Sequence, residues 1–296
     1  MTQQQWPPLA PTRFDLEQPS AARIYDWLLG GERNYAIDRR FGERAVANCP
    51  VVKELAWCNR DFLARAVRQC ARRGVTQFLD IGSGLPTAGN VHEVADEIDP
   101  GSRCVYVDSE SVAVAHANIE LDDNGDPDRH AVVQADLRDV NHVWQEALGT
   151  GVLDPEQPIA LITVATLHFV PPAERAPRAV RDKPDAHAAL AQYRELLPPD
   201  SRLILTHVTE EGVPDDLLPP IRAFVAQYEN SSTPVCFRSR AEIEDFFGDF
   251  ELVEPGVAWL PDWHPEEQSE HGNTPEELFA EPARSCVLGG VARKVR

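Results

Sequence analysis

Aspartates and glycines stand in this sequence where a chain of alternating strands and helices could hold a nucleotide-like ligand. The stretch QFLDIGSGLPTAGN, residues 77 to 90, places Asp80 inside an apolar run, two residues before Gly82 and four before Gly84. Glycines let a backbone turn sharply and approach a ligand without a Cβ atom in the way. A carboxylate beside such a loop favours a ligand that carries positive charge.

Two further aspartates close apolar runs. Asp108 ends RCVYVDS, at a position where a carboxylate can accept hydrogen bonds from both hydroxyls of a ribose. Asp136 ends AVVQAD and precedes Leu137, so an acceptor for the exocyclic amine of adenine would lie beside an apolar face. Each aspartate alone could equally be a helix cap or a turn residue. Their order along the chain predicts a nucleoside site.

The loop does not have the full dinucleotide pattern. That fingerprint has a third glycine three residues after the second, and Thr87 occupies this position. An NAD-dependent oxidoreductase is therefore disfavoured. We expect Thr87 instead to cap the following helix, whose N-terminus favours negative charge.

The surrounding pattern predicts an α/β fold. Short apolar runs alternate with helical stretches after Gly74, which implies right-handed crossovers and a mostly parallel, Rossmann-like sheet of seven strands with helices on both faces. The expected strands are QFLDIG, RCVYVDS, AVVQAD, PIALITVAT, SRLILTHVT, FELVEPGVAWLP and SCVLGGVARKV, and the expected helices are 87–98, 110–120, 140–148, 186–197, 215–228 and 239–248.

The chain divides into three expected regions. Residues 1–19 predict a loose, disordered arm, 20–74 an N-terminal helical extension that begins after Ser20 as N-cap, and 75–296 the Rossmann-like domain. Within that domain, residues 261–284 are mostly acidic and contain prolines, which predicts a mobile insert. The arginines of residues 60–73 indicate a solvated basic helix face.

Composition excludes some partners. Forty-eight acidic against 28 basic residues give a formal charge of -20, and such a field repels nucleic acid and anionic lipid. No apolar run approaches the ~18 residues of a membrane span. The six cysteines show no CxxC spacing and are expected to be reduced. With no recognisable leader at the N-terminus, we expect a cytoplasmic protein without a nucleic-acid or membrane partner.

The first motif, DIGSG, resembles that of the class I methyltransferases, which use S-adenosylmethionine. The chain is similar, over residues 20–296, to a bacterial family catalogued as domain of unknown function 574. The segments that carry this resemblance are ARIYDWLLGGERNY, NRDFLARAVR, QFLDIGSGLPTAGNVHEVA, VYVDSE, ADLRD, LHFV, ELVEPGV and GGVARK. The resemblance implies S-adenosylmethionine as cofactor and leaves the methyl acceptor open. The acidic insert departs from the family pattern, so its relation to the acceptor site is open too.

The segment ARIYDWLLGGERNY has two interpretations. As a lid, its Gly30–Gly31 turn would place Asn34 and Tyr35 over the cofactor, with Tyr25 also in contact, and would exclude water. As a packing helix, it would end at a Gly-Gly C-cap with Tyr25 in the core. The family resemblance favours the lid. We also include Ser83, Ser109 and Thr163 in the predicted cofactor site.

His168, after the fourth strand, is the candidate catalytic residue, either as a general base or as a loop anchor. His207 carries the same alternatives, and Tyr228, Trp259 and Trp263 either line an acceptor pocket or fill core. No metal site is expected, because His264, Glu266 and His271 lack a matching ligand set. The sequence thus predicts an S-adenosylmethionine-dependent methyltransferase with a small-molecule acceptor. The alternative is a regulatory protein that binds S-adenosylmethionine without turnover.

Overall fold

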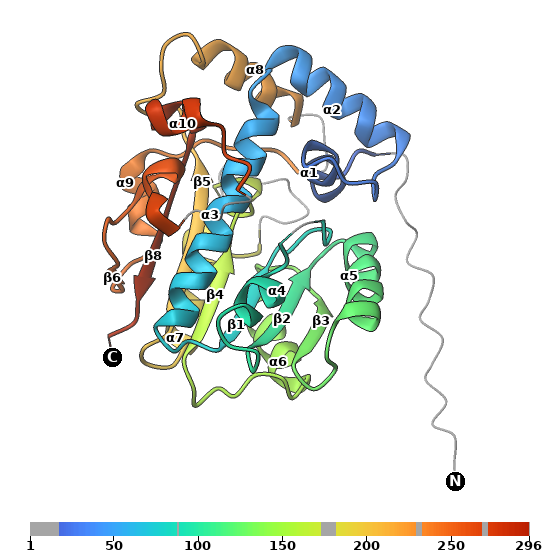
Figure 1. Ribbon diagram of the computed structural model, residues 1–296, viewed down its shortest axis with the longest axis vertical. Helices are drawn as coiled ribbons and strands as arrows, with labels where there is room; N and C mark the ends of the chain where they lie inside the picture. The colour runs from blue at the N-terminus through green and yellow to red at the C-terminus, as the bar shows by residue number, and fades with distance from the viewer. Residues whose placement is uncertain (1–17, 88, 173–181, 229–232, 268–271, 296) are drawn as a thin grey trace.

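A computed structural model describes residues 18–87, 89–172, 182–228, 233–267 and 272–295 (Figure 1). In these residues, eight strands form one sheet in the order β3-β2-β1-β4-β5-β8-β6, with β7 also paired to β8. The strands are β1 (Gln77–Ile81), β2 (Arg103–Asp108), β3 (His130–Gln134), β4 (Ile159–Thr163), β5 (Arg202–Val208), β6 (Glu251–Leu252), β7 (Ala258–Trp259) and β8 (Val287–Arg293).

The expected α/β fold is confirmed, with one difference at its edge. Strands β1 to β5 pair in parallel, and β8 runs antiparallel between β5 and β6. The single strand expected over FELVEPGVAWLP is two short strands, because the chain turns at Gly256, whose φ is +86°. The sheet order reverses between β1 and β4, and ligands of open α/β sheets bind at such a reversal.

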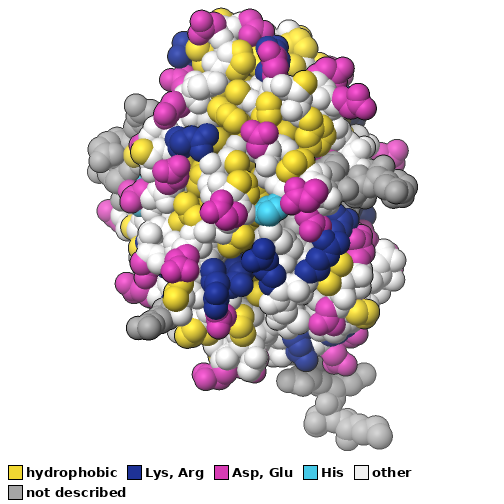
Figure 2. All heavy atoms as spheres, turned by 60° about the vertical axis from the view of Figure 1, so that its left-hand side comes forward, with side chains coloured by type: hydrophobic (Ala, Val, Ile, Leu, Met, Phe, Trp, Pro, Cys, Tyr) yellow, Lys and Arg dark blue, Asp and Glu magenta, His cyan; other side chains and the backbone are white. Residues whose placement is uncertain are grey.

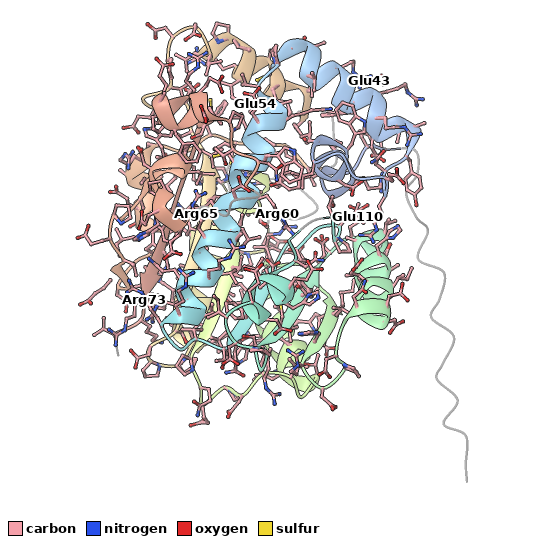
Figure 3. All side chains as sticks on the ribbon, in the orientation of Figure 1. Glu43, Glu54, Arg60, Arg65, Arg73 and Glu110 are labelled. Atoms are coloured by element: carbon pink, nitrogen blue, oxygen red, sulfur yellow. The ribbon has the colours of Figure 1, made fainter. Side chains whose placement is uncertain are left out.

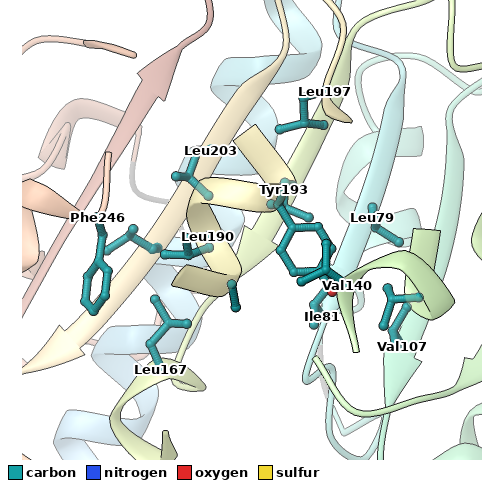
Figure 4. Close-up of a cluster of buried hydrophobic side chains, with 14 of the residues drawn as sticks. Leu79, Ile81, Val107, Val140, Leu167, Leu190, Tyr193, Leu197, Leu203 and Phe246 are labelled. Carbon is teal, nitrogen blue, oxygen red and sulfur yellow. The ribbon is translucent and has the colours of Figure 1, made fainter. Parts of the chain in front are cut away.

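Helices cover both faces of the sheet, because side chains of each strand point alternately to either side. Leu79 and Ile81 of β1 join a cluster with α6 (Val140–Gly149), α7 (Ala186–Leu196) and α9 (Arg240–Asp245), part of which Figure 4 shows. Phe78 faces α3 (Val52–Arg72) and α4 (Val91–Asp96) on the opposite side. Asp80 shares the face of Phe78, so its carboxylate lies toward α3.

Within residues 18–76, three helices precede the first strand, as the helical extension predicts. Helix α1 (Ala21–Leu28) begins after Ser20, whose Oγ accepts from the Arg23 N–H as the expected N-cap. Helix α2 (Ala36–Asn48) then leads to α3. A third apolar cluster joins these helices to α8 (Leu218–Gln227). In Figure 1, α1, α2 and α8 lie together above the carboxyl ends of the strands, so the extension covers the edge where a ligand would bind.

The helix after the glycine loop begins later than expected. Helix α4 starts at Val91, behind Asn90, whose N–H is bonded by the Glu93 carboxylate at 2.7 Å. Thr87 therefore caps no helix, and the prediction that it does is wrong. The remaining helix of the nucleotide-binding half, α5 (Ser111–Asn124), follows β2 close to its expected bounds.

The expected mobile insert is packed in its described parts. Trp263 is fully buried against Phe62 of α3, and helix α10 (Glu276–Ala280) buries Leu278 in the same cluster. Arg65 of α3 donates to the carbonyls of Trp263 and Leu260 at 3.0 and 2.7 Å. The prediction of a solvated basic face is thus wrong at Arg65, which is fully buried and donates to two backbone carbonyls of the segment packed on α3. Residues 268–271 lie outside the described residues.

Acidic side chains are common on the face drawn in Figure 2, as the composition predicts, and they are not concentrated in one patch. Asp and Glu side chains are spread over most of this face, whereas Lys and Arg side chains gather in a band across its lower half. Among the residues that the structure describes, no helix combines the length and apolar character that a membrane crossing needs.

Candidate active site

One large cavity of about 580 Å³ lies at the carboxyl ends of the parallel strands. Its floor comes from the ends of β1 to β5, and its walls come from α1, α3, α8 and the turn after β4, the 3-10 helix η1 (Leu167–Phe169). Binding pockets for small molecules typically measure roughly 300–1,000 Å³. The cavity is therefore large enough for a cofactor and lies at the reversal of strand order.

The glycine loop forms one side of this cavity. Gly82 and Gly84 have φ values of +74° and +67°, which side chains with a Cβ rarely adopt. A Cβ atom at Gly82 would lie 2.5 Å from the Thr166 side chain, whereas at Gly84 the nearest atom is Ala22 Cβ at 4.0 Å. Gly82 thus lets the loops after β1 and β4 meet, and Gly84 leaves open space beside α1. Ser83, between them, also lines the cavity.

Asp108 closes β2 and holds the loop in place. Its Oδ2 accepts from the Gly84 N–H and its Oδ1 from the Glu110 N–H, both at 2.8 Å. Burial raises the pKa of Asp108, although these backbone hydrogen bonds oppose the shift. A carboxylate has about four lone-pair sites, and the backbone N–H groups of Gly84, Glu110 and Ser109 bond to it, so at least one site remains for a ligand hydroxyl. Asp108 and Ser109 both line the cavity, as a ribose contact requires.

Asp136 and Leu137 line the cavity beyond β3. The Asp136 carboxylate accepts from the Arg138 N–H, Nε and Nη2 and from Lys183 Nζ, at 2.7 to 3.0 Å. Burial acts to raise its pKa, but these hydrogen bonds hold the pKa well below the usual range. All of its lone-pair sites are thereby occupied, so an adenine amine could reach Asp136 only by displacing one partner.

Asp80 is the acidic residue of the cavity that lies inside strand β1. It is 6% exposed, and burial raises its pKa to about 7, while Arg60 opposes the shift and Asp108 adds to it. Arg60 lines the cavity on the side of α3 that faces Glu110, opposite Arg65 (Figure 3). A cationic ligand next to a carboxyl group with a raised pKa would favour its charged form, so Asp80 suits a ligand that carries positive charge.

Tyr25 of α1 lines the cavity and also packs against the apolar cluster of α1, α2, α3 and α8, so its position fits both interpretations of this segment. Its hydroxyl donates to the Ala56 carbonyl at 3.0 Å and accepts from Asn59 Nδ2 at 3.1 Å. Asn59 Oδ1 in turn accepts from Thr206 Oγ1 at 2.7 Å, and Thr206 accepts from the Ala165 N–H at 2.9 Å. This chain of hydrogen bonds joins α1, α3, β5 and the turn after β4 along the cavity wall.

The structure does not bring three of the predicted cofactor residues to the cavity. Asn34 is buried and donates to Asp26 and to the Gly31 carbonyl, and Tyr35 is 40% exposed and does not line the cavity. The Gly-Gly segment ends α1, since the Gly30 and Gly31 N–H groups bond the Trp27 and Asp26 carbonyls.

Thr163 is also absent from the cavity wall, because its side chain is buried within the sheet at 1% exposure. Sequence reasoning missed Asn59, Arg60, Thr166 and Thr206, which all line the cavity. Asn59 and Arg60 begin the segment NRDFLARAVR, which the resemblance marked. Arg60 was expected on the solvated basic helix face, and its place in the cavity wall corrects that prediction at a second arginine.

His168 lines the cavity and is 9% exposed. Burial, with the nearby positive charge of Arg238, lowers its pKa to about 3. A group with so low a pKa is neutral near pH 7 and accepts a proton only weakly, so this environment does not suit a general base. Its Nδ1 has no hydrogen-bond partner among the described residues, so this nitrogen does not make the anchoring bond of the alternative interpretation.

Of the other aromatic and histidine candidates, one lines the cavity and the rest are packed in the core. Tyr228 lines the cavity, whereas Trp259 and Trp263 do not and pack in the core. His207 is fully buried and bonds the Val208 carbonyl and Arg238. Within the described part of the chain, no group of three His, Cys, Asp or Glu residues could hold a metal ion.

The donors and acceptors around the cavity suit S-adenosylmethionine: a glycine loop with room at Gly84, a carboxylate with a free lone-pair site at Asp108, and a buried acid at Asp80 for positive charge. By fold and site, this is a class I methyltransferase that uses S-adenosylmethionine.

Comparison with known proteins leads to the same class. The sequence profile of the S-adenosyl methyltransferase family matches residues 8–295. A crystal structure described as a methyltransferase from Thermobifida fusca YX is 34% identical, with 98% of this chain and 100% of that chain covered and a TM-score of 0.80. A family 574 protein from Streptomyces avermitilis MA-4680 is 32% identical, with coverages of 95% and 100% and a TM-score of 0.80.

The chain therefore belongs to the S-adenosyl methyltransferase family. It is an S-adenosylmethionine-dependent methyltransferase and has a methyl acceptor as its second substrate. A search of curated proteins gives no match, so the identity of the acceptor has to be argued from the site.

Proposed function

We propose that this methyltransferase acts on a small organic molecule that binds in the same cavity as the cofactor. The observation that carries the proposal is the position of the cavity, which lies beneath α1, α3 and α8 and continues from the glycine loop to the inner side of α8. An acceptor held there would sit among groups already fixed by folding, and positioning of this kind supplies much of the rate of a transfer reaction.

The cofactor roles follow the cavity wall. Asp108 would accept hydrogen bonds from the ribose hydroxyls, and Leu137 would contact the adenine. The Gly82–Gly84 loop would pack against the bound cofactor. Asp136 would contact the exocyclic amine if Lys183, which is 31% exposed, gives up its hydrogen bond. Asp80 and Tyr25 would lie nearest the charged end of the cofactor. S-adenosylmethionine supplies a methyl group on a positively charged sulfur, which a nucleophile can take directly.

Helix α1 serves in this proposal as a cover over the cofactor. Ser20 donates to Glu110, and Arg23 bonds Glu110 at 2.5 Å and Asp38 at 2.7 Å. Glu110 follows Asp108 by two residues and gives it a backbone hydrogen bond. A ligand at Asp108 would thus stabilise the segment that holds α1, and a closed α1 would exclude water from the reacting group.

The protein, with methyl-labelled S-adenosylmethionine and a small-molecule extract of cells, should transfer label to an organic compound. The Asp108→Ala variant in the same extract controls for transfer by contaminants. If label goes only to the nucleic-acid or protein fraction of a whole lysate, the small-molecule proposal is wrong. If labelled cofactor binds and no fraction takes up the methyl group, the alternative of binding without turnover, which the family match does not favour, replaces it.

We further propose that the protein works in the cytoplasm. All six cysteines are buried, and none forms a disulfide, which suits a reducing compartment. Fractionation of cells followed by detection of the protein tests this location, and recovery outside the cytoplasmic fraction would contradict it.

A further inference from the structure

The cavity has a second region, away from the glycine loop, whose wall is aliphatic and aromatic. We call this region the apolar chamber. It is lined by Leu28 and Leu29 of α1, Val52, Leu55 and Ala56 of α3, Phe169 and Val170 after β4, Val208 of β5, Ile221, Phe224 and Val225 of α8, and Tyr228, Val235 and Val287. Most of these residues belong to the apolar cluster that joins α1, α2, α3 and α8.

Charge is absent from the described wall of the apolar chamber. The charged residues that line the cavity are Arg23, Arg60, Asp80, Asp108, Glu110, Asp136 and Arg138. Arg23 bonds Glu110, and Arg60 borders a second, small pocket together with Ser83 and Gly84. These groups therefore lie on the cofactor side. A charged ligand in the chamber would lose its hydration without a counter-charge, at a cost of several kcal/mol.

Aromatic rings concentrate on one side of the apolar chamber. Tyr228 packs with Phe169 at a centroid distance of 5.7 Å and with Phe224 at 5.5 Å in an edge-on arrangement. Phe169 also contacts the His168 ring at 4.4 Å. Rings at such distances offer faces and edges to a further ring, so a planar guest would add to a set of contacts that already exists.

His168 is a polar group of this region, together with Thr233, and one of its ring nitrogens has unmet hydrogen-bonding capacity among the described residues. The side chains of Asn59, Thr206 and Tyr25 are engaged with one another. His168 has Nδ1 without a partner among the described residues, although the side chain is nine-tenths buried. A buried imidazole without a partner costs free energy, and a bound molecule with one polar atom could recover part of it.

Resting on the proposed function, we propose that the apolar chamber binds the methyl acceptor as an uncharged aromatic molecule whose polar atom forms a hydrogen bond with His168. The rings of Phe169, Phe224 and Tyr228 select a planar guest, and the charge-free wall selects against an anion or a cation. His168 acts as a neutral hydrogen-bonding group, so the chamber recognises a hydroxyl or N–H on the ring.

Three probes test these features separately. Indole is an uncharged aromatic molecule with an N–H group, indoleacetate adds a negative charge to the same ring, and cyclohexanol has a hydroxyl group without an aromatic ring. Their binding to the full chain is measured by calorimetry with saturating S-adenosylhomocysteine. We expect indole to bind, with indoleacetate and cyclohexanol each weaker by at least about tenfold, given the cost of burying a charge and the contribution of ring contacts. Equal or tighter binding of indoleacetate would overturn the charge-free chamber, and equal binding of cyclohexanol would overturn the aromatic selection.

Matched variants test whether indole binds in the apolar chamber. Phe224→Leu and Phe169→Leu remove a lining ring and should each weaken indole binding roughly threefold to tenfold. His168→Leu should weaken it, and His168→Gln, which keeps a hydrogen-bonding group, should restore part of the loss. Phe237→Leu removes a ring that packs in the same cluster without lining the cavity, so it should leave indole affinity unchanged.

S-adenosylhomocysteine affinity is measured for every variant as the readout of the proposed function. If the wild-type chain fails to bind S-adenosylhomocysteine, the proposed function fails. If it binds S-adenosylhomocysteine and the lining variants bind indole as the wild type does, or if the wild type does not bind indole, the apolar chamber is not the acceptor site for aromatic molecules.

Discussion

Thr87, in the loop after β1, donates a hydrogen bond of 2.9 Å to Oδ1 of Asp26 on α1. The other oxygen of this carboxylate accepts from Asn34 Nδ2 at 2.8 Å, and Asp26 is 1% exposed. A single buried carboxylate therefore joins the cofactor loop to the N-terminal helices. Thr87, expected to cap a helix, and Asn34, expected to contact the cofactor, both act through Asp26 instead.

This relationship predicts a coupling between Asp26 and Gly31. A Cβ atom at Gly31 would lie 2.1 Å from Asp26 Oδ1, so Gly31→Ala should destabilise the protein by roughly 1–3 kcal/mol through overpacking. In an Asp26→Ala background the same substitution should cost much less. Urea unfolding of the two single variants and the double variant measures the coupling. Additive losses would show that the contact does not exist in solution.

The second prediction concerns Asp108. Asp108→Ala should weaken S-adenosylmethionine binding roughly tenfold to 100-fold, because it removes charge-assisted hydrogen bonds to the ribose and frees the Gly84 N–H. Titration calorimetry measures the affinity, and Asp123→Ala, at an exposed position of α5, is the matched control. An unchanged affinity in a folded Asp108→Ala variant would remove Asp108 from the site.

The third prediction is a pH dependence of stability from Asp80, whose pKa is raised from 3.8 to about 7 by burial. The folded state binds this proton more tightly than the unfolded chain, so Asp80 makes the free energy of unfolding decrease as pH rises from roughly 4, with no further change above about 7. Asp80→Asn should remove this decrease. Denaturant unfolding at several pH values tests it, and parallel pH profiles for both proteins would contradict it.

The fourth prediction also concerns Asp80, in cofactor binding. A cationic ligand favours the charged carboxylate, so S-adenosylmethionine should bind more tightly as pH rises toward 7 and should release a proton there. Calorimetry in buffers of different ionisation enthalpy counts that proton. Asp80→Asn should bind without proton release and more weakly above pH 7. Proton release that persists in the variant would assign it to another group.

The fifth prediction concerns the contact between α3 and the insert. Arg65→Met should destabilise the protein by roughly 2–4 kcal/mol, because it removes the buried hydrogen bonds from Arg65 to the Trp263 and Leu260 carbonyls. Arg68→Met is the control, since its partner Glu97 is half exposed and should matter by less than about 1 kcal/mol. Both variants should bind S-adenosylmethionine normally. Equal unfolding midpoints for the two variants would show that Arg65 does not anchor the insert.

Much of the fold and part of the site could be read from the sequence, because those features depend on local pattern. Apolar runs alternating with helical stretches predicted the parallel strands, since period and turn residues act over a few positions. The aspartates at residues 80, 108 and 136 and the glycines at 82 and 84 followed from their places at strand ends, and the structure brings all five to the cavity.

What the tertiary structure alone decided depends on partners distant in sequence. Asn34 and Tyr35 are residue types that often contact ligands, yet Asn34 bonds Asp26 and Tyr35 lies under the Arg23 guanidinium at 40% exposure. The carbonyls that accept hydrogen bonds from the buried Arg65 side chain lie about 200 residues further along the chain. His168 has its low pKa because folding buries it near Arg238. Burial and long-range hydrogen bonds set these roles, and neither leaves a periodic signal in the sequence.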